Sequence, residues 1–362
     1  MSSAIESDRG AAQQYRLGVD IGGTFTDIVL VAPDGHLHNC KVSSTEDDYA
    51  LGILAGIEQV LSSAALNDVA VSEIMHGTTV ASNTILQMSG ARTGLITTDG
   101  FRDVLELRTL RMPRLYDLKW EKPPPLVERY LRVEVEERIN SQGGVDKPLT
   151  RADAQQAVDR LLSDGVEAIA VCLINAYANP EHERLLLEVI NEKAPGLPCC
   201  ASCDVLPENK EYERTSTTVI NAYLLPVVAG YLDSLVSKLK DEGLEAPLLL
   251  MQSNGGLTTV DQTRRLPCHI IESGPAGGVV GAQALSQKLG LADIVTFDMG
   301  GTTAKASLVE NGQYSRAVEY SVGAGIMIGS RLLTGAGYPV SYTHLRAHET
   351  RHDLVCSLLL EK

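Results

Sequence analysis

The sequence is short of basic residues. It has 31 Lys and Arg against 46 Asp and Glu in 362 residues, so its formal net charge is −15. Proteins whose main partner is nucleic acid or an anionic membrane surface usually carry an excess of positive charge. We therefore exclude these two partner classes as the main role. ATP remains a compatible ligand, because backbone N–H groups and a divalent cation can meet its phosphates.

Targeting signals and paired cysteines are also lacking. No apolar run of about 18 residues predicts a membrane span, and residues 1–15 lack the basic and apolar segments of a signal peptide, so we expect a disordered tail. The seven cysteines are odd in number and scattered, which suits a reducing cytoplasm. Cys200 and Cys203 form a C-x-x-C without a second ligand pair, so a metal or redox site is not favoured.

Strand-like and helix-like segments alternate along the chain, which predicts an α/β fold. We expect strands at 36–42, 69–75, 92–97, 131–135 and 166–174, and helices at 49–61 and after Thr78 or Thr79, Thr150 and Asn179. Residues 109–148 are rich in proline and arginine and predict an extended insert. This insert either shapes a substrate mouth or a subunit contact, or is a surface excursion with solvated charges.

The most informative stretch is a glycine turn between two apolar β-rich runs, residues 16–31. Its polar positions are Asp20, Gly22, Gly23, Thr24 and Thr26. Paired glycines permit a tight turn and leave backbone N–H groups uncovered, so the turn can cradle a phosphate. The nearby carboxylate can hold a metal through water. Alone, this pattern is more simply a hairpin turn with polar decoration.

The same pattern recurs near the end of the chain, again between apolar runs. The matching positions there are Asp298, Gly300, Gly301, Thr302 and Thr303. The two copies are too far apart for a short repeat array and indicate a duplicated architecture. Two such hairpins facing each other would clamp a nucleotide.

These paired D-x-G-G-T hairpins resemble the superfamily of actin, the sugar kinases and the heat-shock chaperone ATPases. The surrounding segments are similar to one branch, the A-type subunits of the hydantoinase/oxoprolinase family, which includes N-methylhydantoinase and acetone carboxylase subunits. The segments that carry this resemblance include HGTTVASNTILQ (76–87), GARTGLITTDGFRDVLELR (90–108), LPENKEYERTSTTVINAYL (206–224), MQSNGG (251–256) and ESGPAGGVVGA (272–282).

The resemblance implies a duplicated actin-like ATPase fold with ATP and Mg²⁺, or another divalent cation, as cofactors. It also implies a B-type partner subunit and a cyclic amide (a hydantoin or 5-oxoproline) or a ketone, whose carbonyl or enol oxygen ATP phosphorylates. Asp20 and Asp298 would orient Mg²⁺-bound water or the attacking group. The phosphates would be met by the turn residues of both hairpins: Gly22, Gly23, Thr24, Thr26, Gly300, Gly301, Thr302 and Thr303.

Two further segments are candidates for the substrate or the cleft. His76, Thr78 and Thr79 lie where a strand enters a helix, and His76 is the histidine to test for proton transfer, although a histidine hydrogen-bonded into a turn is the simpler interpretation. Asn254, Gly255 and Gly256 follow a short strand at its carboxyl end, where ligands gather in open α/β sheets.

We expect an N-terminal actin-like half at 16–204 and the start of a second half at 205–340. After Val340 the resemblance stops, and 341–362 is similar to a translated sequencing adapter, so we expect a foreign tail and an incomplete nucleotide site. Three other functions share the hairpins: a small-molecule kinase, a chaperone-like or motor-like ATPase, and a non-catalytic nucleotide-binding regulatory subunit.

Overall fold

The structure is a computed structural model. It describes residues 14–45, 48–64, 66, 70–109, 119, 124–299 and 303–314, and the backbone of five short stretches between 316 and 346. Residues 1–13, the tryptophan of the insert and most of 341–362 lie outside the described residues, so the expectations for both ends of the chain stay predictions.

The first sheet has six strands in the order β12-β11-β4-β1-β2-β3. These strands are β1 (Gln14–Ile21), β2 (Phe25–Val31), β3 (Leu37–Ser43), β4 (Ala70–Thr78), β11 (Leu248–Met251) and β12 (Leu257–Thr259). β1, β2 and β3 are antiparallel neighbours, while β4 runs parallel to β1 and β11 runs parallel to β4. Helix α1 (Tyr49–Ser63) packs against β2 and β3, and its side chains Ile53, Ile57 and Val60 share one core with Leu17 and Ile28.

The second sheet is parallel throughout, in the order β10-β9-β5-β6. Its strands are β5 (Thr93–Thr98), β6 (Arg132–Val135), β9 (Ala168–Cys172) and β10 (Cys199–Ala201), accompanied by α2 (Val80–Leu86), α3 (Val104–Leu107), η1 (Arg129–Leu131), β7 (Arg138–Ile139), β8 (Val145–Lys147), α4 (Arg151–Ser163), α5 (Glu181–Lys193) and α6 (Ser202–Val205). Every residue of β9 is buried, as predicted for a strand covered on both faces.

Helix α7 (Glu211–Asp241) joins the two sheets. Its first half packs against β9, β10 and α6, and its second half packs against α1. Pro226 lies inside it and does not split it, since the helix is one element of 31 residues. α7 is long and apolar enough to cross a membrane by length and composition, yet 56% of its most apolar window is buried inside the protein, as in a core helix.

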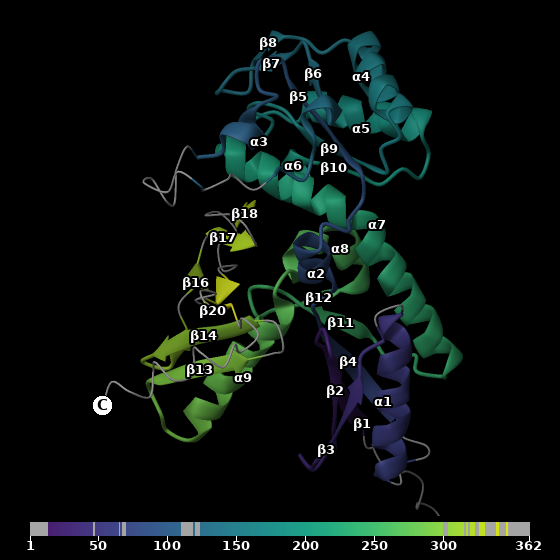
Figure 1. The fold of residues 1–362 in the computed structure, drawn as a ribbon, viewed down its shortest axis with the longest axis vertical. Helices are drawn as coiled ribbons and strands as arrows, with labels where there is room; N and C mark the ends of the chain where they lie inside the picture. Colours follow the sequence, from purple (N-terminus) through teal and green to yellow (C-terminus); the bar gives the residue numbers. More distant parts are fainter. Residues whose placement is uncertain are drawn as a thin grey trace, which may run out of the picture.

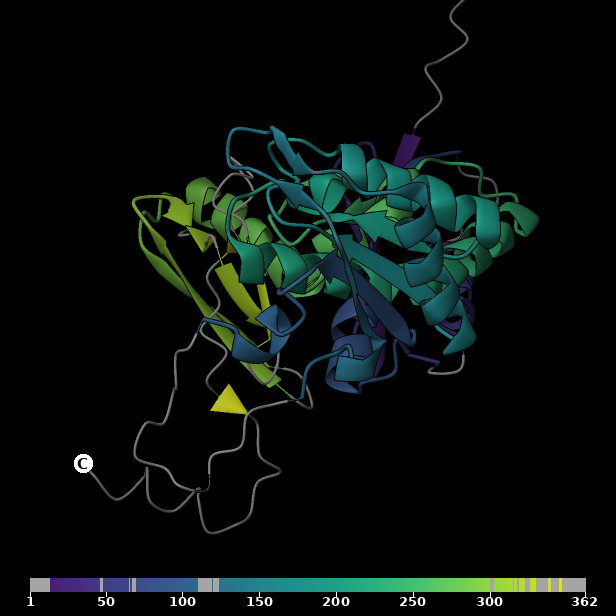
Figure 2. The ribbon, with the colours of Figure 1, turned by 90° about the horizontal axis from the view of Figure 1, so that it is seen from above.

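The chain then forms α8 (Val260–Arg265), η2 (Pro267–Ile270) and α9 (Ser273–Lys288) and enters a third sheet, β13 (Ile294–Met299), β14 (Thr303–Glu310) and β15 (Gln313–Tyr314). The remaining short strands are β16 (Arg316–Ala317), β17 (Glu319–Val322), β18 (Ile326–Gly329), β19 (Tyr338–Pro339) and β20 (Leu345–Arg346). In Figure 1 the second sheet lies at the top, with the first sheet and the β13–β14 hairpin below it on opposite sides, and Figure 2 shows from above that this hairpin stands to one side of the rest.

The sheets do not follow the expected division at residue 204. β11 and β12 come after that position, yet they extend the first sheet through β4. The first sheet is therefore interrupted by the whole second sheet and α7, and a new sheet begins only at β13. Strand pairing between segments this far apart leaves no local signal in the sequence.

Candidate nucleotide site

The two glycine hairpins have the same backbone register. In the first, Asp20 of β1 lies opposite Asp27 of β2. In the second, Asp298 of β13 lies opposite Lys305 of β14. Gly300, Gly301 and Thr302, predicted to contact phosphate, lie outside the described residues, and only the backbone of Thr303 is described. The equal register supports the duplication inferred from the sequence.

The first turn exposes part of its backbone. Gly22 N–H donates to the Phe25 carbonyl at 2.9 Å, which closes the turn. Gly23 and Thr24 are exposed, and their N–H groups donate to no other group within the part of the chain that the structure describes. These two amides, rather than all the turn residues, are the ones that point to anion binding.

Thr26 does not face outward as predicted. It is fully buried, and its hydroxyl lies 3.0 Å from Ser44 Oγ. Because Ser44 Oγ donates to the Gly22 carbonyl at 2.9 Å, the Thr26 hydroxyl donates to Ser44. Thr26 thus fixes the turn from beneath. Its position on the inner face of β2, beside Ile28 and Leu30, follows from the period of two along a strand.

The Asp20 carboxyl group joins the two hairpins electrostatically. Burial raises its pKa above the ordinary value, the negative charges of Asp27 and Asp298 raise it further, and Lys41 opposes them. Lys41 is held by Asp27, with Nζ 2.7 Å from Oδ2. The Asp298 charge thus acts on Asp20 although the two residues lie at opposite ends of the described chain. Asp27 was not among the predicted site residues.

Two glycines from different elements make room for Asp20. A Cβ on Gly77 of β4 would lie 2.7 Å from Asp20 Oδ1, and one on Gly274 of α9 would lie 3.2 Å from it. α9 is fixed against β4 because Thr78 N–H donates to Ser273 Oγ at 3.1 Å and Ser273 Oγ donates to the Thr78 carbonyl at 2.9 Å. The segment 272–282 was singled out from the sequence, but the approach of Gly274 to Asp20 was not predicted.

His76 is buried and has a protein partner on each ring nitrogen. Nδ1 lies 3.2 Å from the Val19 carbonyl, and Nε2 lies 2.5 Å from the Tyr231 hydroxyl. Since a carbonyl only accepts, Nδ1 carries the proton and Nε2 accepts from Tyr231. Burial lowers the pKa of His76 to about 4. His76 is thus a neutral residue that joins β1, β4 and α7, and proton transfer to a ligand finds no support in this geometry.

The other candidates are also tied into the scaffold. Thr78 is fully buried, and Thr79 Oγ1 donates to the Ile21 carbonyl at 3.2 Å, so both support the first turn from β4. In the loop after β11, Gly256 N–H donates to Asn254 Oδ1 at 2.7 Å. Gly255 has φ +84°, where a side chain is strained, and its Cβ would meet Val280 at 2.6 Å.

The residues present are compatible with a nucleotide whose cation contacts few protein atoms directly. Within the described ranges there is no group of three His, Cys, Asp or Glu side chains that could hold a metal. The donors on offer are the carboxylates of Asp20 and Asp298 and the exposed turn amides of Gly23 and Thr24. Carboxylates whose repulsion raises a pKa gain stability from a nearby cation, as in sites where Mg²⁺ keeps most of its waters.

Two protein-family models match this chain, and together they cover most of it. Residues 16–194 match the hydantoinase/oxoprolinase N-terminal region, and residues 214–350 match the hydantoinase/oxoprolinase family itself. The chain belongs to the hydantoinase/oxoprolinase family. The second match extends past Val340, where we expected the resemblance to stop.

Relatives within this family are ATP-dependent enzymes by name. The chain is 34% identical over 344 residues to caprolactamase subunit alpha of Pseudomonas jessenii, covering 92% of this chain and 49% of that protein. The crystal structure of the ATP-dependent caprolactamase superposes with a TM-score of 0.80 at 32% identity, over 91% of this chain and 47% of that one. A nucleotide-free acetone carboxylase structure gives 0.79 at 28% identity, over 88% and 46%.

These likenesses confirm the predicted family and the mixed α/β fold. The chain spans about half the length of the curated relatives it matches most strongly. Several of these relatives are named as subunits, including those of caprolactamase, acetophenone carboxylase and acetone carboxylase.

Proposed function

We propose that this chain is the ATP-dependent part of an enzyme that activates the carbonyl group of a cyclic amide or a ketone by phosphoryl transfer. The observation that carries the proposal is that two glycine hairpins share one register and that the Asp298 charge of the second raises the pKa of Asp20 in the first. Relatives named as an ATP-dependent caprolactamase and as an acetone carboxylase subunit support the substrate classes.

The residues would divide the work of a positioning and electrostatic mechanism. The amides of Gly23 and Thr24 are free to donate to phosphate oxygens, whereas Gly22 N–H already closes the turn. Asp20 and Asp298 would orient the water shell of a divalent cation. When bound, ATP supplies a phosphoryl group that turns an unreactive carbonyl oxygen into a leaving group.

Gly77 and Gly274 contribute by having no side chain. Both backbones approach Asp20 so closely that a Cβ would displace its carboxylate. They therefore leave room for the Asp20 carboxylate, whose Oδ1 lies against both backbones. We infer in addition a B-type partner subunit and a cytoplasmic location, the latter from the six described cysteines, all of which are free thiols.

The test measures ADP release by the natural full-length chain, co-expressed with its B-type partner, in the presence of Mg²⁺. Hydantoin, 5-oxoproline, caprolactam and acetone are added singly. We expect one of them to stimulate ADP release, and expect Asp20→Asn and Asp298→Asn to abolish the stimulation. Asp159→Asn is the matched control. It removes the ion pair between Asp159 of α4 and Lys193 of α5 on the surface, and we expect the stimulation of ADP release to remain.

Other outcomes select the alternatives. A phosphorylated small molecule released without the partner would identify a kinase. ADP release indifferent to every substrate would identify a motor-like or chaperone-like ATPase. Nucleotide binding without any turnover would leave a regulatory subunit, and absence of nucleotide binding would remove the basis of the proposal.

A further inference from the structure

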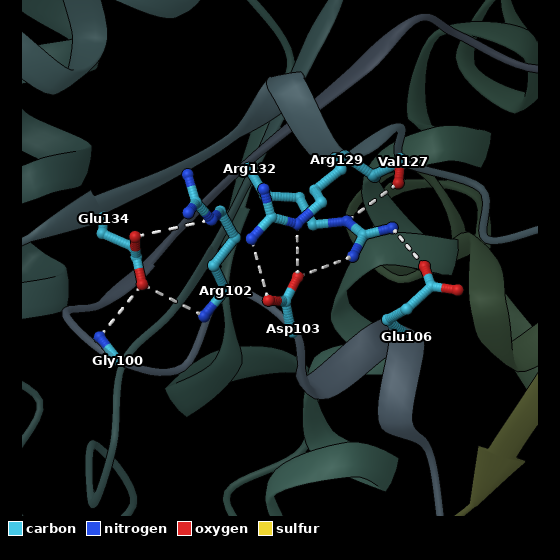
Figure 3. A network of polar contacts seen from close by, with 8 residues as sticks. All are labelled: Gly100, Arg102, Asp103, Glu106, Val127, Arg129, Arg132 and Glu134. Atoms are coloured by element: carbon cyan, nitrogen blue, oxygen red, sulfur yellow. Dashed lines mark hydrogen bonds and ion pairs between the residues drawn. The ribbon is translucent and has the colours of Figure 1, made fainter.

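An arginine-lined cavity lies on the second sheet, away from the two hairpins. Its volume is about 880 Å³, within the range of small-molecule sites. The edge strand β6, the 3₁₀-helix η1 and the loop before α3 form its walls, and Arg160 reaches it from α4. Arg132 comes from β6, Arg129 from η1 and Arg102 from the loop before α3. Figure 3 shows the contacts of these three side chains.

Arg132 is the unusual member, because its side chain is only 1% exposed. Its Nε donates to the Val127 carbonyl at 3.0 Å and its Nη2 donates to Glu106 at 3.2 Å. Nη1 is buried and has no hydrogen-bond acceptor among the described residues. The carboxylate of Asp103 approaches it only to 3.8 Å, beyond hydrogen-bonding range.

Asp103 is not available to move closer. Both of its oxygens accept from Arg129, at 2.9 and 3.0 Å, in a two-point contact that fixes the carboxylate. Arg102 repeats the pattern on the other side of the network. Its buried Nε has no hydrogen-bond acceptor within the described chain, and Glu134 Oε2 lies 3.5 Å away. Two guanidinium nitrogens of residues that line this cavity are therefore buried without a hydrogen-bond acceptor in the described chain.

The charges around the cavity limit what that acceptor can be. Glu106, Glu128 and Glu134 line the same space as the four arginines. Glu128 is exposed, and its carboxylate makes no ion pair or hydrogen bond in the described part of the chain. A simple anion would meet this carboxylate unfavourably, whereas a ligand with a cationic group would pair with it.

We propose that the cavity binds a small amino acid in its zwitterionic form, with the carboxylate on Arg132 and Arg102 and the ammonium group near Glu128. The carboxylate oxygens satisfy the two buried donors, and the net charge of the cavity is unchanged on binding. Hydrolysis of a cyclic amide produces such a molecule, so on the proposed function the site takes the ring-opened product. That last identification rests on the proposed function, while the site itself does not.

The test is isothermal titration calorimetry on the full chain without nucleotide, so that it is judged separately from ATP chemistry. The probes are 6-aminohexanoate and L-glutamate, compared with hexanoate, hexylamine, caprolactam and inorganic phosphate. We expect at least one of the two amino acids to bind tenfold or more tightly than each of the other probes.

Variants assign the contacts. Arg132→Lys is expected to weaken amino-acid binding at least tenfold. Because Arg132 also supports Val127 and Glu106, Arg102→Gln provides a second test at a partly exposed side chain and should weaken it severalfold. Glu128→Gln should weaken the amino acid but leave hexanoate binding unchanged. Arg151→Gln, which breaks a surface ion pair with Glu192, is the control and should change nothing.

Three results would overturn the proposal. Phosphate or hexanoate binding as tightly as the amino acids would show a plain oxyanion site. Equal affinity of the parent protein and Glu128→Gln for the amino acid would remove the role of the cationic group. No heat with any probe would mean that the buried donors are satisfied by water alone.

Discussion

The buried histidine makes a quantitative prediction about acid stability. His76 is neutral in the folded protein because burial lowers its pKa to about 4, an effect that the hydrogen bond to the Val19 carbonyl only partly offsets. In the unfolded chain its pKa is near 6.5. Between these values the unfolded state binds more protons than the folded state, so the free energy of unfolding falls as the pH falls.

The size of the effect follows from the gap between the two pKa values. It corresponds to about 3 kcal/mol of stability, fully present above pH 6.5 and lost progressively as the pH falls toward 4. Because the side chain is only 1% exposed, solvent screening does not reduce this figure. A non-titrating residue at the same place would lack this contribution to the pH dependence.

The assay is urea unfolding followed by far-UV circular dichroism at pH 7 and pH 4.5. We expect the parent protein to lose about 2.5 kcal/mol more than His76→Gln over this interval. Tyr231→Phe leaves the buried Nε2 without a donor and should cost about 1–3 kcal/mol at pH 7 while the histidine still titrates. Parallel pH curves for the parent and His76→Gln would refute the reasoning.

Three further predictions concern single groups. Gly77→Ala places a methyl group against Asp20 and should weaken Mg²⁺–nucleotide binding at least tenfold, while Gly278→Ala, with open space around its Cβ, should stabilise α9 by about 0.5–1 kcal/mol; calorimetry checks both. Asp298→Asn should lower the pKa of Asp20, measured by carbon NMR of its carboxyl group. Because burial raises its thiol pKa, Cys200 should resist iodoacetamide at pH 8 until the protein is unfolded.

Each of these three predictions has a result that would contradict it. Unchanged nucleotide affinity in Gly77→Ala would mean that the Asp20 rotamer does not matter. An Asp20 pKa indifferent to Asp298 would separate the two hairpins, and rapid alkylation of Cys200 in the native state would contradict its burial.

Local signals in the sequence were sufficient for most elements. Thr150 was recognised as a cap, and its side chain does accept from the Asp153 N–H at the start of α4. The apolar run at 166–174 became the fully buried strand β9. In both places the relevant contacts lie within a few residues or follow from composition alone, so the sequence could predict them.

What depended on distant partners could not be predicted. β11 pairs with β4 although the whole second sheet and α7 lie between these two strands in the sequence. The hydroxyls of Thr215 and Thr218 donate to carbonyls one turn earlier in α7 and so give no sign of a ligand site there. The inward position of Thr26 was available from the alternation of β2, but the hydroxyl next to a glycine turn favoured the wrong interpretation.

The continuity of α7 has a mechanical consequence. Val219 and Leu224 belong to the core of the second sheet, Leu235 and Leu239 belong to the core of the first, and Tyr231 contacts both. The two sheets therefore cannot rotate against each other unless this helix bends. Pro226 lies within the part of α7 that packs on the core of the second sheet, which extends to Leu232; it has no N–H, so a bend at that turn breaks one hydrogen bond fewer than elsewhere. The helix that joins the two sheets thus also limits how far they can move against each other.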